Sequence, residues 1–270
     1  MNPRSETEQL FRLDGQVAVV TGAGGLLGEH HAAALADAGA HLVLADIRTD
    51  RTTELATRLA KRGTRALAIT CDVTQPEDWR ALLKSTLTEF GRVDVLINNA
   101  ACTVQSPTAG YEAGLAEFPL ADWVKILDVN LTGTLLGCQA IGAQMLAQRS
   151  GAIVNIASLY GVVSPHHKMY PGTGIHQPVA YSVSKAGVIA LTRYVATAWA
   201  ESGIRVNCIT PGGVENQHAE LFKSRFAALN PMGRMARPDE MKGAILYLSS
   251  SASRYCTGHN LVVDGGWTSW

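Results

Sequence analysis

The fold is decided at residues 16–28, which read QVAVVTGAGGLLG. The first six residues form a short apolar run typical of a parallel strand buried on both faces. Glycines follow at once, and a segment with helical periodicity begins at Leu26. Glycine lets the backbone turn tightly and approach a pyrophosphate, which then meets the free N–H groups at the start of the helix. Because glycine-rich turns between strands and helices are common, the rest of the chain has to support this interpretation.

Apolar runs alternate with helical patterns along almost the whole chain. We expect strands at Gln16–Thr21, His41–Asp46, Arg65–Thr70, Val93–Asn98, Ala152–Ala157, Arg205–Ile209 and Asn260–Val263. We expect helices at Leu26–Ala38, Arg51–Arg62, Pro76–Phe90, Leu120–Gln148, Tyr181–Ser202 and Pro238–Ser249, and a loop at Tyr170–Pro178. This repeat implies right-handed crossovers and a Rossmann-like, doubly wound parallel sheet of the α/β class. Because the sequence contains no recognisable linker, we expect a single domain at 14–270 after a loosely held N-terminal arm at 1–13.

Composition excludes several classes of protein. The 270 residues carry no net charge, so there is no electrostatic case for a nucleic acid or an anionic membrane surface as partner. No apolar stretch is long enough to span a bilayer, and the first residues lack a hydrophobic signal core, so we expect a cytoplasmic protein. The five cysteines are scattered without a CxxC pair, and neither His30-His31 nor His166-His167 has the spacing of a catalytic metal site. We predict neither disulfides nor a metal.

Polar residues end the second, third and fourth predicted strands. Asp46 stands eighteen positions after Gly28, where a carboxylate can accept hydrogen bonds from the adenosine ribose and would repel a 2′-phosphate. This predicts NAD in preference to NADP, although an arginine as close as Arg48 can accommodate that phosphate. Asp72-Val73 and Asn98-Asn99 end the next two strands and should face the same crevice, but such residues are also ordinary turn formers.

The segment YSVSK at 181–185 suggests acid–base chemistry. Tyr181 and Lys185 are four residues apart, so they share one face of a helix. A tyrosine titrates near ~10, and it can act as a base at neutral pH only if its phenolate is stabilised. A neighbouring ammonium and a positively charged nicotinamide would each lower that pKa, by roughly 1–3 units. A bare YxxxK pattern is common by chance, and the alternative is a packed tyrosine beside a solvated lysine.

Taken together, the motifs resemble the short-chain dehydrogenase/reductase family, in its compact single-domain branch, over about residues 15–270. The matching pieces stand in the order of that family: TGAGGLLG at 21–28, LAD at 44–46, CDV at 71–73, NNAA at 98–101, DVNLTG at 128–133, IVNIAS at 153–158, YSVSK at 181–185, RVNCITPG at 205–212 and NLVVDGGW at 260–267. Each piece is weak alone, and the ordered set is highly specific.

The resemblance implies a role for each matching residue. The catalytic residues would be Asn130, Ser158, Tyr181 and Lys185. Tyr181 would be the general acid/base and Lys185 would hold the nicotinamide ribose, while Ser158 would hydrogen-bond the substrate oxygen. Asn130 would disturb its helix and help to anchor a water of the proton relay. The cofactor would lie against Gly22, Gly25, Leu27, Gly28, Asp46, Asp72, Val73, Asn99, Tyr181, Lys185, Pro211, Gly212 and Val214.

Three features depart from the family pattern. Leu26 replaces a usual glycine, and the spacing of Gly22, Gly25 and Gly28 resembles that of the sugar-nucleotide epimerase branch, whose substrate lobe this chain has no room for. Ser158 and Tyr181 are separated by 23 positions, roughly twice the usual gap, and the extra residues fall within 162–179. Glu215-Asn216 replaces a usual threonine, so Asn216 would have to supply the missing polar group.

The function that follows is an NAD-dependent oxidoreductase that interconverts a secondary alcohol and a ketone. The polar segment 162–179, with His166, His167 and His176, suits a hydroxyl-rich substrate such as a sugar, sugar acid or polyol, or it builds subunit contacts instead. Apolar helical surface and the resemblance together imply a homotetramer. Two alternatives remain open: a sugar epimerase or dehydratase that uses NAD transiently, and an NAD-binding sensor without catalysis.

Overall fold

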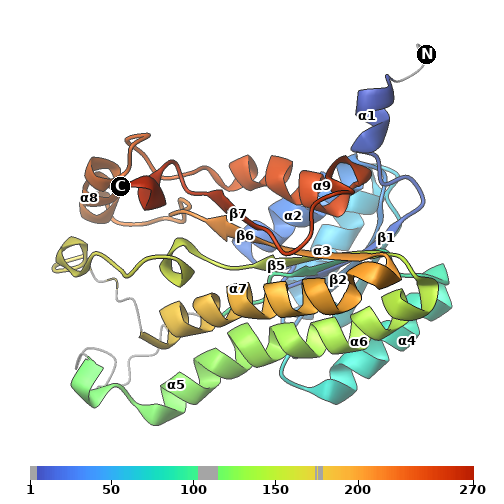
Figure 1. Ribbon diagram of the computed structural model, residues 1–270, viewed down its shortest axis with the longest axis horizontal. Helices are drawn as coiled ribbons and strands as arrows, with labels where there is room; N and C mark the ends of the chain where they lie inside the picture. The colour runs from blue at the N-terminus through green and yellow to red at the C-terminus, as the bar shows by residue number, and fades with distance from the viewer. Residues whose placement is uncertain (1–4, 103–114, 174, 176–178) are drawn as a thin grey trace.

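The doubly wound sheet is present. The computed structural model describes residues 5–102, 115–173, 175 and 179–270, and within them seven parallel strands form one sheet in the order β3-β2-β1-β4-β5-β6-β7 (Figure 1). The strands are β1 (Val17–Thr21), β2 (His41–Asp46), β3 (Ala66–Thr70), β4 (Val95–Asn98), β5 (Gly151–Ile156), β6 (Ile204–Pro211) and β7 (Asn260–Val263). Each coincides with a predicted strand. The order reverses between β1 and β4, which is where such sheets bind ligands.

Helices cover both faces of the sheet, as Figure 1 shows. On one face lie α2 (Leu26–Asp37), α3 (Thr49–Ala60) and α9 (Lys242–Ser249); on the other lie α4 (Pro76–Phe90), α6 (Gly133–Gln148) and α7 (Val179–Trp199). Alternate residues of β1 supply the two cores, with Ala18 and Val20 on the first face and Val17 and Val19 on the second. No helix in the described ranges combines the length and apolarity needed to cross a membrane.

The predicted helix Leu120–Gln148 is interrupted. It consists of α5 (Leu120–Leu127), a π-helical turn η2 (Asp128–Thr132) and α6. The interruption surrounds Asn130, as the resemblance implied. A π turn widens the helix by one residue and is frequent at functional sites, because it places a side chain where a regular helix would not.

Two helices, α1 and α8, were not predicted from the sequence, and α7 begins earlier than predicted. In the arm, α1 (Glu6–Leu10) is started by a capping box between Ser5 and Glu8 and buries none of its residues. The other is α8 (Glu220–Leu229), whose Phe222 and Phe226 are buried one turn apart. Since α7 begins at Val179, Tyr181 lies inside its first turn rather than at its start.

A buried polar chain ties the site-bearing elements together. Asn98 at the end of β4 donates through Nδ2 to Oδ1 of Asn155 in β5 at 2.9 Å. Asn155 in turn donates to Oγ1 of Thr192 in α7, also at 2.9 Å. All three side chains are buried, where polar groups need hydrogen-bond partners, and these two bonds supply them across neighbouring elements. The chain therefore fixes β4, β5 and α7 relative to one another.

A close backbone contact holds the segment after β5 against α7. Gly161 ends η3 (Leu159–Gly161), and a Cβ placed on it would lie 2.7 Å from the carbonyl carbon of Lys185 and 2.9 Å from the nitrogen of Ala186. These are backbone atoms of a packed helix, which cannot move aside as a flexible side chain can. Only glycine fits at this position.

We predict that Gly161→Ala lowers the free energy of unfolding by about 1–3 kcal/mol, because the added methyl forces η3 away from α7. The control is Gly243→Ala in α9, where an added Cβ meets nothing within 4 Å. That variant should be unchanged or more stable by up to about 1 kcal/mol, since alanine favours helix. Urea denaturation measures both values, and equal effects of the two substitutions would contradict the packing argument.

Candidate active site

The glycine-rich turn is built by close backbone approach. Gly22 has a φ of 60°, and a Cβ on it would lie 2.8 Å from Cα of Ala100 after β4. A Cβ on Gly28, in the first turn of α2, would collide with the carbonyl oxygen of Gly22. Gly25 caps the helix without any side-chain hydrogen bond. The backbone N–H groups at the start of α2 thus face the cleft, where they can donate hydrogen bonds to a phosphate, as the sequence predicts.

A single cleft of about 1320 Å³ brings the predicted residues together. Every predicted cofactor residue lines it: Gly22, Gly25, Leu27, Gly28, Asp46, Asp72, Val73, Asn99, Tyr181, Lys185, Pro211, Gly212 and Val214. Ser158 lines it as well, whereas Asn130 does not. The cleft runs along the carboxyl ends of the strands, at the place where their order reverses. Within the described residues, no group of three or more histidine, cysteine or acidic side chains could hold a metal ion.

Asp46 and Asn99 hold the glycine-rich turn in place. One carboxylate oxygen of Asp46 accepts from the N–H of Gly24 at 3.0 Å, and the other accepts from the N–H of Arg48 at 2.9 Å. The guanidinium of Arg48 lies 3.7 Å from the same carboxylate. Asn99 donates to the carbonyls of Thr21 and Gly22 at 2.9 and 3.1 Å. Both residues therefore shape the turn as well as facing the cleft.

The buried side chain of Lys185 lies next to the half-buried side chain of Tyr181. The Lys185 ammonium donates to the carbonyl of Ile156 at the end of β5 at 2.7 Å, and lies 5.7 Å from the centroid of the Tyr181 ring. Burial lowers the pKa of Lys185 to about 8. Burial raises the pKa of Tyr181, and a hydrogen bond with Ser158 acts in the opposite direction.

The pKa of Tyr181 thus differs from the sequence-based expectation that Lys185 lowers it. In the chain alone, loss of hydration disfavours the phenolate more than its polar neighbours favour it. A lowered pKa would require a further positive charge in the cleft.

Ser158 reaches Tyr181 despite the long separation in sequence. It follows β5 directly, and its hydroxyl accepts from the N–H of Tyr160 at 3.3 Å, which starts the short helix η3. The contact of Gly161 with the backbone of Lys185 then sets η3 against α7. The added residues that the structure describes come after this contact, so the long separation in sequence does not prevent Ser158 from pairing with Tyr181.

Asn130 is buried and does not line the cleft. Its Oδ1 accepts from the N–H of Cys102 at 2.7 Å, and its Nδ2 donates to the carbonyl of Cys102 at 3.2 Å and to the hydroxyl of Ser184 at 3.1 Å. The side chain is buried, so it joins the π turn, the segment after β4 and α7. Its place in a water relay stays a prediction.

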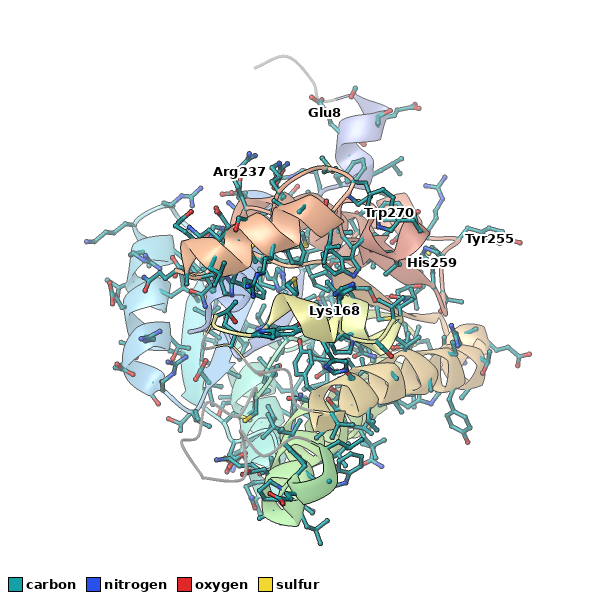
Figure 2. All side chains as sticks on the ribbon, turned by 90° about the vertical axis from the view of Figure 1, so that its left-hand side faces the viewer. Glu8, Lys168, Arg237, Tyr255, His259 and Trp270 are labelled. Carbon is teal, nitrogen blue, oxygen red and sulfur yellow. The ribbon has the colours of Figure 1, made fainter. Side chains whose placement is uncertain are left out.

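The extra residues at 162–179, here called the inserted segment, pack on α8 through the part that the structure describes. Figure 2 looks onto the side of the molecule that carries it, with Lys168 near the centre of that face. Arg225 of α8 donates to the carbonyls of Met169 and Pro171 at 3.1 and 2.5 Å. The hydroxyls of Tyr160 and Tyr170 are hydrogen-bonded to each other. His176, the third histidine named for this segment, lies outside the described residues.

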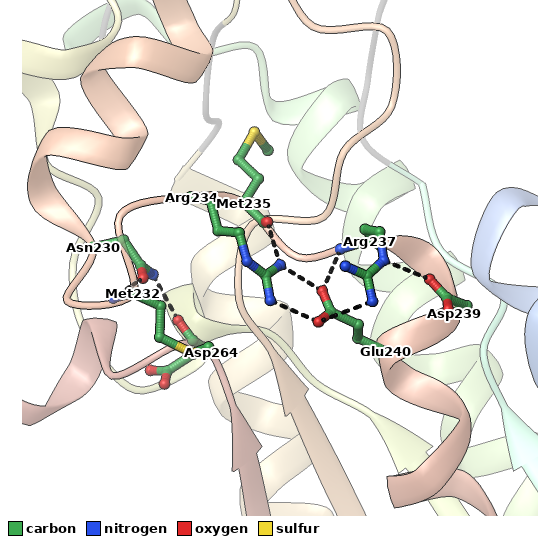
Figure 3. Close-up of polar contacts among 8 residues, drawn as sticks. All are labelled: Asn230, Met232, Arg234, Met235, Arg237, Asp239, Glu240 and Asp264. Carbon is green, nitrogen blue, oxygen red and sulfur yellow. Dashed lines mark hydrogen bonds and ion pairs between the residues drawn. The ribbon is translucent and has the colours of Figure 1, made fainter.

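Contacts made by the residues after α8 hold the loop that follows β6. Arg234 binds Glu240 through two hydrogen bonds of 2.6 and 2.7 Å, drawn in Figure 3. The hydrogen bond with Arg234 lowers the pKa of Glu240 to about 2. Nearby, the N–H of Ala236 donates to the carbonyl of Gly213 at 2.8 Å. The loop that carries Gly212 and Val214 is therefore held from its outer side.

Sequence reasoning missed several residues of the cleft. Its lining also includes Ile47, Thr74, Leu120, Ala121, Val124, Lys125, Asp128 and His218. Most come from α5 or from positions beside a recognised motif. Ile47 directly follows Asp46 and could have been found from that motif, whereas no sequence signal marks His218.

Comparison with known proteins gives consistent matches. The family model described as enoyl-(acyl carrier protein) reductase matches residues 22–268. A D-threitol dehydrogenase from Mycolicibacterium smegmatis is 37% identical over 263 residues, which cover 96% of this chain and 95% of that protein. A cis-4-hydroxycyclohexanecarboxylate dehydrogenase from Sinomonas cyclohexanicum is 38% identical over 257 residues, covering 94% and 96%. The crystal structure of a gluconate 5-dehydrogenase from Burkholderia cenocepacia, in complex with NADP and tartrate, has a TM-score of 0.87 at 31% identity, covering 98% and 100%.

The buried ammonium leads to a stability prediction. The pKa of Lys185 is about 8 in the folded protein, below its ordinary value of 10.5. Between these values the unfolded chain holds a proton that the folded protein has released, so rising pH favours folding. Relative to Lys185→Met, the wild-type free energy of unfolding should therefore rise by about 2 kcal/mol between roughly pH 8 and pH 10.

Urea denaturation of both proteins across this pH range measures the difference. Burial raises the pKa of Cys71, Cys138 and Cys208, which weakens folding at high pH, but it does so equally in both proteins. If the difference in free energy of unfolding between the two proteins does not change with pH, the pKa of Lys185 is not lowered by burial.

Proposed function

Because the chain belongs to the short-chain dehydrogenase/reductase family, whose members here are oxidoreductases acting on CH–OH groups, we propose that Tyr181, Lys185 and Ser158 carry out this chemistry in the cleft. One observation carries the proposal: the half-buried phenol of Tyr181 lines the same cleft as a buried ammonium and a buried hydroxyl, and the glycine-rich turn lines that cleft as well. The relatives named above are described as dehydrogenases, so neither alternative function, a sugar epimerase or dehydratase or an NAD-binding sensor, has support.

The residues fit a nicotinamide dinucleotide. The turn at Gly22–Gly28 offers free N–H groups at the start of α2, and Asp46 stands where the adenosine ribose would lie. Asp72 and Val73 would meet the adenine, and Pro211, Gly212 and Val214 would flank the nicotinamide. When bound, the dinucleotide accepts or gives up the hydride.

The chain's own residues move and hold the proton. During oxidation, the Tyr181 oxygen takes the proton of the alcohol, and the Ser158 hydroxyl donates a hydrogen bond to the same substrate oxygen. Lys185 keeps a positive charge within reach of the phenolate and of a ribose hydroxyl. Because burial alone raises the pKa of Tyr181, a further cation in the cleft is what makes the phenolate accessible near neutral pH.

We favour NAD over NADP as the dinucleotide. The carboxylate of Asp46 is fixed by Gly24 and Arg48 at the end of β2, where it would repel a 2′-phosphate. The guanidinium of Arg48 is already engaged by that carboxylate at 3.7 Å. The gluconate 5-dehydrogenase that this chain resembles was solved with NADP, so the other choice occurs in a similar fold.

Oxygen-rich alcohols are the proposed substrates, in the range of polyols, sugars and sugar acids. Each relative named above is described by a substrate that carries an alcohol and at least one further oxygen group. The cleft matches this chemistry, because Lys125, Asp128, Asn216 and His218 add polar groups to its lining.

We further propose a cytoplasmic homotetramer built from the domain at 14–270, to which Leu13 of the predicted arm also belongs because it is fully buried in the core. Exposed apolar side chains support association: Val183 and Tyr194 on α7 are 43% and 75% exposed, and Leu135 on α6 is 37% exposed. Trp270 at the end of the chain is also largely exposed. Such surface is usually covered by a partner.

Replacing Tyr181 tests the proposed acid/base. We predict that Tyr181→Phe lowers kcat by about 10²-fold or more while the affinity for NAD stays nearly the same, because only the proton transfer is removed. The control is Tyr194→Phe on the exposed face of the same helix. Steady-state rates from the absorbance of reduced nicotinamide, with NAD binding by fluorescence titration, measure both effects. Full activity of Tyr181→Phe would remove this residue from the mechanism.

Replacing Asp46 tests the choice of dinucleotide. We predict that Asp46→Ala lowers the ratio of kcat/KM for NAD to that for NADP by about tenfold, the equivalent of one hydrogen bond to a charged group. Asp50→Ala, at an exposed position of α3, should leave the ratio unchanged. An unchanged ratio in Asp46→Ala refutes the assignment of Asp46 to the ribose.

A further inference from the structure

His218 is a cleft residue that the proposed mechanism does not use. It lies in the loop between β6 and α8, is half-buried, and lines the same cleft as Ser158 and Tyr181. Its Nδ1 accepts a hydrogen bond from the backbone N–H of Asn216 at 3.2 Å. A neutral imidazole has one proton, and because Nδ1 accepts, that proton is on Nε2. Nε2 has no hydrogen-bond partner among the residues that the structure describes, so it is an available donor.

The imidazole ring is held in position from two sides. Its centroid lies 5.0 Å from that of Phe222 in α8, and Phe222 in turn contacts Tyr170 of the inserted segment at 6.0 Å. Between Asn216 and His218 stands Gln217, whose φ is 52°. A residue with a side chain adopts this left-handed conformation rarely and at a cost, and such residues gather at ligand sites. Here it turns the chain so that the His218 ring folds back on Asn216.

The ring is neutral near neutral pH. Burial and the charge of Lys223 both lower the pKa of His218, while Glu215 acts in the opposite direction. A neutral donor suits a hydroxyl or a carboxylate oxygen. The reacting oxygen is already taken by Ser158 and Tyr181 in the proposed function, so the oxygen that His218 meets is a different one.

We propose that His218, through Nε2–H, donates a hydrogen bond to a second oxygen of the substrate and thereby selects polyols and hydroxy acids over simple alcohols. This inference rests on the proposed function and specifies its substrate class. The inserted segment contributes indirectly, because Tyr170 packs on Phe222 and Arg225 ties α8 to Met169 and Pro171. In a simpler interpretation His218 only packs on Phe222 and completes its turn, and that interpretation predicts no dependence on the substrate's remote hydroxyls.

The test compares two alcohols that share their reacting carbons. A tetritol and the butanediol with its two hydroxyls on the inner carbons differ only in the terminal hydroxyls. For wild type, His218→Phe and His218→Gln, kcat/KM is measured on both with saturating NAD. We expect His218→Phe to lower the tetritol-to-butanediol ratio by about tenfold, the loss of one hydrogen bond to a buried group. His218→Gln keeps an N–H donor and should recover part of the ratio.

Controls separate recognition from folding. His167→Phe, on the exposed surface of the inserted segment, should leave the ratio at its wild-type value. An unchanged ratio in His218→Phe, or equal losses on both alcohols, would overturn the inference and leave the proposed function standing. If the tetritol is a poor substrate, the same comparison is made with the best polyol or hydroxy acid and its terminally deoxygenated counterpart. A wild-type protein that oxidises no secondary alcohol with NAD or NADP would overturn the proposed function itself, and the inference with it.

Discussion

The burial of one ammonium group constrains the whole site. Moving a charged side chain out of water is costly, and among the described residues Lys185 is compensated by one hydrogen bond, to the carbonyl of Ile156. No ion pair to Lys185 exists among the described residues, so the penalty appears as a pKa near 8. A fold keeps such a group only if the surrounding packing is strong enough to hold it. In the proposed function, this buried ammonium is the positive charge that would face the phenolate and a ribose hydroxyl in the cleft.

The packing that holds this charge comes from rigid elements. Asn98, Asn155 and Thr192 link two central strands to α7 through buried hydrogen bonds. Gly161 brings η3 onto the backbone of the same helix, and the π turn places Asn130 against Ser184. Each contact fixes α7 against the carboxyl end of β5. A proton-transfer site needs this precision, because small displacements of the reacting groups reduce the rate steeply.

The sequence predicted those parts of the structure that depend on regular patterns. The seven strands followed from apolar runs, and the phosphate-binding turn followed from glycines whose added Cβ atoms would strike the backbone. The predicted residues of the cleft met there because parallel strands present all their carboxyl ends on one side. The prediction for the tyrosine pKa did not hold for the chain alone, since spacing shows which charges are near but not how far burial removes water from them.

The surroundings of His218 were beyond sequence reasoning for a different reason. They are formed by α8 and the inserted segment, whose contacts join residues more than fifty positions apart, as in the bond from Arg225 to Met169. His218 depends on a left-handed residue at Gln217, and no sequence pattern predicts that conformation outside glycine. These surroundings are joined to the site through η3, because Leu159 packs with Met169 and Phe222 and the hydroxyl of Tyr160 is hydrogen-bonded to that of Tyr170. In the proposed function, the core therefore positions Tyr181 and Lys185, while a loop and a helix that pack on η3 position His218.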